Sequence, residues 1–338
     1  MSRHPIAIAC LCLLCLCIRL EASPAHGAGQ TLNLQFENDF FGGGTDRHFT
    51  HGTRVECVTK PIRWITDLAD MLPWFSSERA ESDPKEALRG RASISLGQNM
   101  YTPENTTATT LVSDDRPYAG WLYVGVGLAA NQGSERYDKL ELEIGVVGPA
   151  SMAEKVQTFW HSLLGLQVPE GWDNQLHNEP GIVLYYEQAL RLVKGRLRNG
   201  LKVDGVPHFG GAIGNVYTYG AAGFTVRLGS NLDDDFGPPR IRPSLPGSGF
   251  FQPGNGLSWY LFAGVEGRAV LRNIFLDGNT FRDSHSVDKK PLVGDLQAGL
   301  VFQWNRFRFS YTQILRTKEF DGQDRLDIFG SLTLSYHF

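Results

Sequence analysis

Apolar and polar residues alternate along most of the chain, which is the pattern of β-strands with one apolar face. The clearest example ends the chain, where every second residue is apolar: Leu332, Leu334, Tyr336 and Phe338. Turn-forming Gly, Pro, Asn and Asp residues separate the alternating segments. The pattern predicts twelve strands, at about residues 31–39, 49–60, 90–100, 118–131, 135–148, 180–194, 203–215, 217–229, 256–271, 292–304, 306–317 and 327–338.

An even number of long strands, each with one apolar face, is typical of an outer-membrane β-barrel. Such a sheet must close in lipid, because an open edge would leave backbone groups without hydrogen-bond partners. A terminal Phe on an alternating strand, here Phe338, is the signal that the barrel assembly machinery binds. A soluble β-sandwich also has short alternating strands, but it does not account for Phe338. We therefore predict an all-β fold, a twelve-stranded antiparallel transmembrane β-barrel.

The first 28 residues predict an export signal. Arg3 and His4 give a basic start, an apolar run of about 13 residues extends from Ile6 to Ile18, and small residues follow. The run is too short to span a bilayer as a helix. With cleavage between about 25 and 29, residues 29–338 form a single domain of the bacterial outer membrane.

Charge excludes one class of partner. The chain has 32 Lys and Arg residues against 36 Asp and Glu, a net charge of -4, and its basic residues are scattered. Nucleic-acid binding needs a strong positive field, so we expect no nucleic-acid partner.

One segment departs from the β pattern and predicts a short helix. Ser151 and Glu154 have the spacing of a capping box, with Ser151 at the N-cap, and Gly165 ends the helical run. Its apolar residues form one stripe: Met152, Val156, Phe159, Trp160, Leu163 and Leu164. Its polar residues lie on another side: Glu154, Gln157, Thr158 and His161. If the first strand runs outward from the periplasm, this helix lies in an extracellular loop, at the same rim as residues 38–50 and 99–118.

The first strand breaks its own pattern at that rim. Asn38 stands where the next apolar residue is expected, and Asp39 follows it. Together with Thr50 and His161, they would bring an amide, a carboxylate, a hydroxyl and an imidazole to one place. Calcium prefers oxygen ligands, and a largely neutral His can deprotonate a water molecule. Taken singly, each residue has a simpler explanation, as a strand end, a strand residue or a solvated helix residue.

Eight motifs, in order, make the chain similar to the lipid A 3′-O-deacylase family of outer-membrane enzymes, the LpxR type. The similarity extends over essentially the whole mature length. The motifs lie at residues 38–39, 46–52, 98–103, 115–120, 144–149, 161–165, 171–176 and 178–180.

The resemblance implies a Ca²⁺-dependent ester hydrolase that acts on lipid A, the lipid of lipopolysaccharide, from a site between the barrel wall and the loop helix. It assigns His161 as the base and places Asp39, Asn38 and Thr50 around the metal and the oxyanion. Two positions depart from the family pattern. Ala108 replaces a basic residue of some members, which concerns recognition of phosphate or sugar, and Gln167 replaces an acidic residue, which concerns the metal ligands.

Acidic residues near Gln167 that could replace the missing carboxylate are Glu170, Asp173 and Glu179. Two other functions stay open. An outer-membrane phospholipase also uses Ca²⁺ on a twelve-stranded barrel, although the chain shows no match to the Ser/His arrangement of that family. A passive channel or structural barrel would need a roomy lumen, which the inward-facing charges of Arg54 and Glu56 could fill.

Two long segments, 61–90 and 230–255, are rich in Pro, Gly, Ser and charged residues. They predict loops at the periplasmic end, far from the proposed site.

Overall fold

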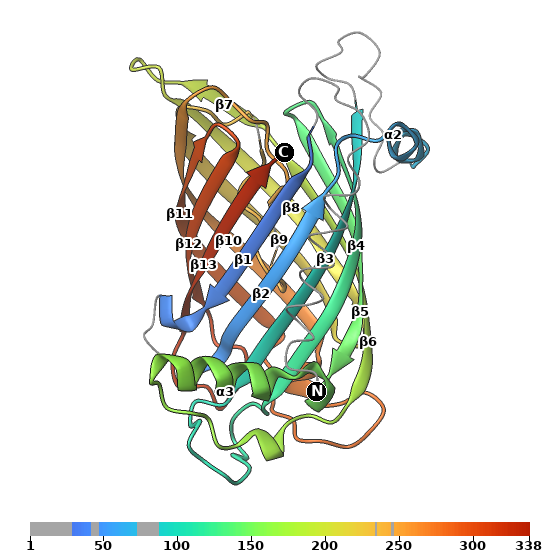
Figure 1. The fold of residues 1–338 in the computed structure, drawn as a ribbon, viewed down its shortest axis with the longest axis vertical. Coiled ribbons are helices and arrows are strands. Elements are labelled where there is room, and N and C mark those ends of the chain that lie inside the picture. Colours follow the sequence, from blue (N-terminus) through green and yellow to red (C-terminus); the bar gives the residue numbers. More distant parts are fainter. Residues whose placement is uncertain (1–28, 42–46, 73–87, 234, 245–246) are drawn as a thin grey trace.

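The computed structural model describes residues 29–41, 47–72, 88–233, 235–244 and 247–338. Twelve long antiparallel strands form a closed barrel (Figure 1), which confirms the predicted fold. The strands are β1 (Thr31–Asn38), β2 (His48–Val58), β3 (Leu88–Thr102), β4 (Ala119–Gln132), β5 (Arg136–Val147), β6 (Glu179–Leu190), β8 (Lys202–Gly214), β9 (Tyr217–Gly229), β10 (Leu257–Asn273), β11 (Leu292–Trp304), β12 (Phe307–Arg316) and β13 (Asp327–His337). The predicted export signal lies outside the described residues.

Two pairings close the sheet. β1 pairs with β13 along its whole length, from Thr31 opposite His337 to Asn38 opposite Gly330. β6 pairs with β8, and the predicted strand 180–194 is divided, because the short β7 (Val193–Arg196) pairs only with the beginning of β8. Among the described residues, no helix is long and apolar enough to cross a membrane.

Side chains on the inward phase of the strands are buried: aromatic and aliphatic residues such as Trp121 and Tyr123 form the largest core cluster, and charged residues form a network beside it. Arg54 of β2 lies 3.1 Å from the carboxylate of Glu56 and 2.5 Å from that of Glu141 on β5. Lys139 lies 2.8 Å from Glu56. Because burial without partners would be costly for each charge, these side chains stabilise one another only as a connected network.

In the segment between β9 and β10, residues 235–244 and 247–251 lie in the lumen, which corrects the prediction of a loop confined to the periplasmic end. The segment begins and ends at the periplasmic end but contacts inward-facing residues from several sides of the barrel. The backbone N–H of Ile241 donates to Glu37 of β1 at 2.9 Å, and Arg242 pairs with Glu141 of β5 and Glu187 of β6. We call residues 235–244 and 247–250 the plug.

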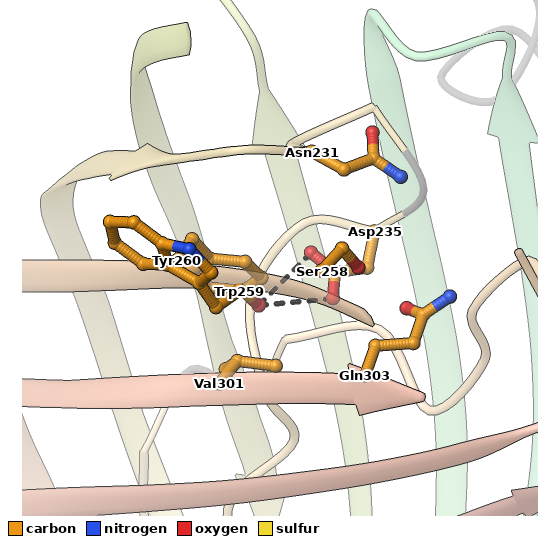
Figure 2. A pocket seen from close by; sticks show the side chains of 7 residues that line it. All are labelled: Asn231, Asp235, Ser258, Trp259, Tyr260, Val301 and Gln303. Atoms are coloured by element: carbon orange, nitrogen blue, oxygen red, sulfur yellow. Dashed lines mark hydrogen bonds between the residues drawn. The ribbon is translucent and has the colours of Figure 1, made fainter. Parts of the chain in front are cut away.

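Asp235 anchors the beginning of the plug. Figure 2 shows its carboxylate hydrogen-bonded to the hydroxyl of Tyr260, which lies 3.1 and 3.0 Å from the two oxygens, beside a cavity of only about 10 Å³. Arg227 and Arg308 also contact Asp235, each at 2.7 Å. Burial raises the pKa of Asp235, but the two arginines outweigh this effect and hold that pKa below its ordinary value. The carboxylate therefore stays charged and holds the plug to the wall.

Short helices lie at both ends of the barrel. At the periplasmic end, α2 (Arg63–Asp70) occupies part of the segment predicted as a loop. At the extracellular end lie η1 (Asp39–Phe41), η2 (Pro149–Ser151), α3 (Ala153–Leu164), η3 (Trp172–Asn174) and α4 (Ile274–Asp277). Figure 1 shows α3 crossing the outside of the wall, near the end of the barrel where η1 lies.

The predicted helix is α3, but its capping box is wrong. The helix begins at Ala153, and its N-cap is Met152 in a left-handed conformation, with φ 59°, so no side chain caps it. Ser151 belongs instead to η2, and its hydroxyl accepts a long hydrogen bond of 3.4 Å from the Ala153 N–H. The predicted end is confirmed, because Gly165 is the C-cap with φ 67°, a conformation that favours glycine.

Candidate active site

A β-bulge shapes the outer wall at the extracellular end of β2. Phe49 pairs with Tyr101 and packs in the lumen, whereas His51 pairs with Met100 on the outward phase. Thr50 is therefore the extra residue, and such a residue re-aims neighbouring side chains. Its hydroxyl lies 2.7 Å from that of Thr102, two residues beyond Met100.

Asn38 lies on the outward phase of β1, directly opposite His51. Its side-chain N–H group donates to the backbone oxygen of Thr50 at 2.8 Å and lies 3.3 Å from Nδ1 of His51. Its side-chain oxygen accepts from the N–H of Phe40 at 2.7 Å and so begins η1. The structure thus brings Asn38 and Thr50 together on the outside of the barrel.

Asp39 is buried at the beginning of η1. One carboxylate oxygen accepts from the backbone N–H of Arg47 at 2.6 Å. The Arg47 guanidinium in turn contacts Glu104 at 3.0 Å and the backbone oxygen of Leu326 at 3.1 Å. Partial burial raises the pKa of Glu104, but Arg325 and Arg47 outweigh it and lower that pKa overall. Three extracellular loops therefore hold the carboxylate of Asp39 in place.

The first half of α3 packs on the outward face of β3 and β4. Ala153 and Val156 contact Met100, Tyr118 and Trp172. The Trp172 indole N–H donates to Gln157 at 2.8 Å. Gly120 of β4 permits this close approach, because a Cβ there would lie 2.0 Å from the Ser151 hydroxyl and 2.4 Å from the Cβ of Ala153.

The second half of α3 is oriented in the opposite way from an amphipathic helix on a soluble protein, because its large apolar side chains are exposed. The buried residues of the helix are Ala153 and Gln157, and His161 follows at the same four-residue interval, on the side that faces the wall. Its large apolar residues are exposed: Phe159, Trp160, Leu163 and Leu164. The predicted apolar stripe is therefore divided: Val156 packs on the wall, whereas the four large residues of the second half face away from the protein and Gln157 faces the barrel.

His161 is half-buried near the end of α3, where Nδ1 lies 2.5 Å from the backbone oxygen of Gln167. The side chain of Gln167 is exposed, and it is the backbone oxygen of this residue that contacts His161. Glu179, by contrast, accepts from the side chain of Asn279 at 3.1 Å and the N–H of Thr280 at 2.8 Å. Its carboxylate therefore belongs to the loop after β10.

The other departure, Ala108, lies where two loops meet. The backbone of Ala108 packs closely on Gly171, because a Cβ at position 171 would lie 2.6 Å from the Ala108 backbone oxygen. Beside this contact, the backbone N–H of Glu170 donates to the backbone oxygen of Thr106 at 2.9 Å and joins the two loops. Glu170 and Asp173 are both exposed.

Sequence reasoning missed three residues that shape the site: Arg47, His51 and Thr102. All three lie within the quoted motifs, and the outward phases of β2 and β3 were the signal that could have identified His51 and Thr102. In the part of the chain that the structure describes, no three or more His, Cys, Asp or Glu side chains form a group that could hold a metal ion. The predicted ligand set has a single carboxylate, that of Asp39, and otherwise neutral oxygens.

The comparisons with known proteins agree with this architecture. A family model described as outer membrane protein LpxR matches residues 8–338. The chain belongs to the LpxR family. The structure of LpxR from Salmonella typhimurium matches with a TM-score of 0.72 and 22% identity, over 91% of this chain and 100% of that chain. This likeness shows the shared barrel fold, and the chain is a protein of the bacterial outer membrane.

Another solved structure, the β domain of the Bordetella autotransporter BrkA, matches with a TM-score of 0.42 and 10% identity, over 92% of this chain and 98% of that chain. No curated protein sequence matches the chain significantly.

Proposed function

We propose that this LpxR-family protein is a Ca²⁺-dependent lipid A deacylase, which hydrolyses the 3′-O-linked acyloxyacyl ester of lipid A in the outer leaflet. The observation that carries the proposal is the polar cluster of Asn38, Thr50 and His51 on the outward face of the barrel. Outward positions of a membrane barrel are normally apolar. A polar cluster there fits a substrate that approaches from the lipid.

Metal binding fits the chemistry of these residues. Asp39 supplies a carboxylate, Asn38 an amide oxygen, and Thr50 a hydroxyl and a backbone oxygen, and oxygen atoms of these kinds are what Ca²⁺ prefers. The side-chain oxygen of Asn38 and one oxygen of Asp39 each accept one backbone hydrogen bond. A carbonyl or carboxylate oxygen has two lone pairs, so one hydrogen bond does not prevent such an oxygen from also binding a metal ion. A bound Ca²⁺ would polarise the ester carbonyl.

The contact of His161 assigns its tautomer. The backbone oxygen of Gln167 can only accept, so Nδ1 of His161 carries the proton in this 2.5 Å hydrogen bond. In the neutral ring, Nε2 then holds the lone pair and is the atom that takes a proton.

The reaction is hydrolysis by water. Nε2 of His161 takes a proton from a water molecule as its oxygen bonds to the ester carbonyl carbon. The bond between that carbon and the 3′ oxygen then breaks, and the proton passes to the 3′ oxygen. The products are a sugar hydroxyl and a free acyloxyacyl acid, without an acyl-enzyme intermediate.

The two other functions have less support. A passive channel needs an open lumen, whereas the plug occupies the lumen here, and two cavities beside it measure about 10 and 30 Å³. A phospholipase would share the approach from lipid, so substrate chemistry must distinguish it from a lipid A deacylase.

The test uses the purified mature protein with lipid A and, separately, with phosphatidylethanolamine in detergent micelles containing Ca²⁺. Mass spectrometry of lipid A should show loss of one acyloxyacyl group, with phosphatidylethanolamine intact. His161→Ala should lose this activity. His177→Ala is a matched control in the same loop, because His177 is also half-buried and the contacts described for it, to Asn279, are made by its backbone. Cleavage of phosphatidylethanolamine alone would contradict the proposal.

A further inference from the structure

The helix α2 lies outside the barrel at its periplasmic end. Figure 1 shows it beside the wall and nearly end-on, so its axis runs across the long axis of the barrel. Ile65 and Ala69 are buried against the wall, and Ala69 packs with Ala130 of β4. Gly90 of β3 donates its backbone N–H to the hydroxyl of Thr66 at 2.9 Å, which fixes the helix to the strand.

The surface of α2 that faces away from the wall is divided between apolar and charged residues. Trp64, Leu68 and Met71, spaced at helical intervals, are 62%, 38% and 79% exposed. A helix turns by about 100° per residue, which puts these three on one side and the exposed Arg63, Asp67 and Asp70 on another. The helix therefore has three sides: one against the barrel, one apolar and one charged.

We infer that α2 is an in-plane membrane anchor whose apolar side, formed by Trp64, Leu68 and Met71, inserts among the phospholipids of the periplasmic leaflet. This apolar side is continuous with the lipid-facing belt of the barrel. The wall beneath α2 is outward-facing and apolar, with Ala130 and Leu140, and Val126, on the same phase of β4 as Ala130, is 57% exposed. The apolar side of α2 extends this belt laterally.

The composition of α2 fits the membrane interface better than it fits water. A short helix parallel to the membrane, with an apolar face and a charged face, inserts at the boundary of headgroups and acyl chains. Trp is enriched at this depth because its ring is apolar and its N–H is polar. Arg63 is placed to contact lipid phosphates from the charged side. This inference is independent of the proposed lipid A chemistry.

The test labels two adjacent residues of the full mature chain. Leu68→Cys on the apolar side and Asp67→Cys on the charged side each receive an environment-sensitive fluorophore, after reconstitution in phosphatidylethanolamine and phosphatidylglycerol vesicles. The unmutated chain, treated in the same way, gives the background from Cys57. Quenching is measured with lipids that carry a nitroxide on a shallow acyl carbon, and with aqueous iodide.

The inference predicts that the label at 68 emits at shorter wavelength, is quenched by the shallow nitroxide and loses iodide quenching, while the label at 67 stays accessible to iodide. Equal iodide quenching at both positions would overturn it. Protection at 68 from both quenchers would also overturn it, because a protein or a second copy of the chain would then cover this side. Both substitutions are on exposed side chains, so folding should be unaffected.

Discussion

Two helices lie on the outside of this barrel, α3 at the extracellular end and α2 at the periplasmic end, and each rests on the wall over a glycine. They differ in what lies near them on the wall. α3 packs on Met100 and Tyr118, but the outward surface at its end of the barrel also carries polar residues, Asn38, Thr50 and Thr102. Beneath α2 the wall is apolar, with Ala130 and Leu140.

Both helices also present exposed apolar side chains to their surroundings, such as Leu163 and Leu68. Membrane contact alone therefore does not distinguish an active site from an anchor. The polar groups on the outward surface near α3 do, because polar residues facing lipid are costly and are typical of functional sites.

The largest expected effect belongs to His161. His161→Ala removes the proposed base, and general base catalysis contributes about 10²–10⁴-fold to a rate. We expect a loss of that size in kcat/KM for lipid A deacylation, with the barrel still folded by circular dichroism. The counterpart in α2 is Thr66→Ala, which should leave deacylation unchanged. Equal losses in the two variants would mean that the two helices do not differ in function.

Removal of the Asp39 charge should come next. Asp39→Asn keeps the shape of the side chain but weakens the proposed metal site. Changes even to groups behind the ligands cost metal sites about 10–100-fold, so we expect at least this loss in Ca²⁺-stimulated activity. Asp70→Asn in α2 is the control, and a Ca²⁺ titration measures both. If a chelator leaves the activity of the unmutated protein intact, the metal assignment is wrong.

The two glycines offer the closest matched pair. In Gly120→Ala the new Cβ would lie 2.4 Å from the Cβ of Ala153, and in Gly90→Ala it would lie 2.6 Å from the backbone nitrogen of Thr66. Each helix must therefore move. Misplacement by 1 Å can cost about 10²-fold in rate, and we expect a loss of about 10-fold for Gly120→Ala, from a smaller shift. Gly90→Ala should deacylate normally, and slower turnover there would show that α2 acts on the site.

The smallest effect concerns the exposed apolar residues. Met71→Ser and Leu163→Ser replace side chains that are 79% and 62% exposed, so in detergent each should change the free energy of unfolding by less than about 0.5 kcal/mol. Denaturant unfolding measures this value. A loss of several kcal/mol in either variant would show that the side chain packs in the protein core.

The alternating pattern predicted the strands well because most outward side chains are apolar and face lipid, while the inward side chains are mixed and pack in the lumen. The same reasoning failed for the plug. Charged residues of this segment, such as Arg242 and Asp235, are typical of a surface loop. The lumen also contains charged side chains, however, and Glu141 and Arg308 pair with these two residues there. The sequence does not show which strands face each other across the lumen, so it cannot predict that charged residues of the plug pair with charged residues of the wall.

The orientation of α3 was also beyond the sequence. Its apolar stripe could be identified, but periodicity does not say whether Phe159 or Gln157 contacts the barrel. In a membrane the answer reverses, because lipid covers the apolar side. The helix α2 was not predicted at all. Its eight residues, with Trp64 and Leu68, are too few to give a clear helical periodicity, and the segment was predicted as a loop. Asn38 and Asp39 could be identified because they break a regular pattern at its end.

The most direct test of the central claim, that the outward polar cluster and His161 of α3 hydrolyse lipid A, is mass spectrometry of lipid A from bacteria that express the protein or its His161→Ala variant. We predict that lipid A from cells with the unmutated protein lacks one acyloxyacyl group, and that lipid A from cells with the variant is intact. Equal loss of the group in both strains would contradict the assignment of His161, and intact lipid A in both would contradict the proposed function.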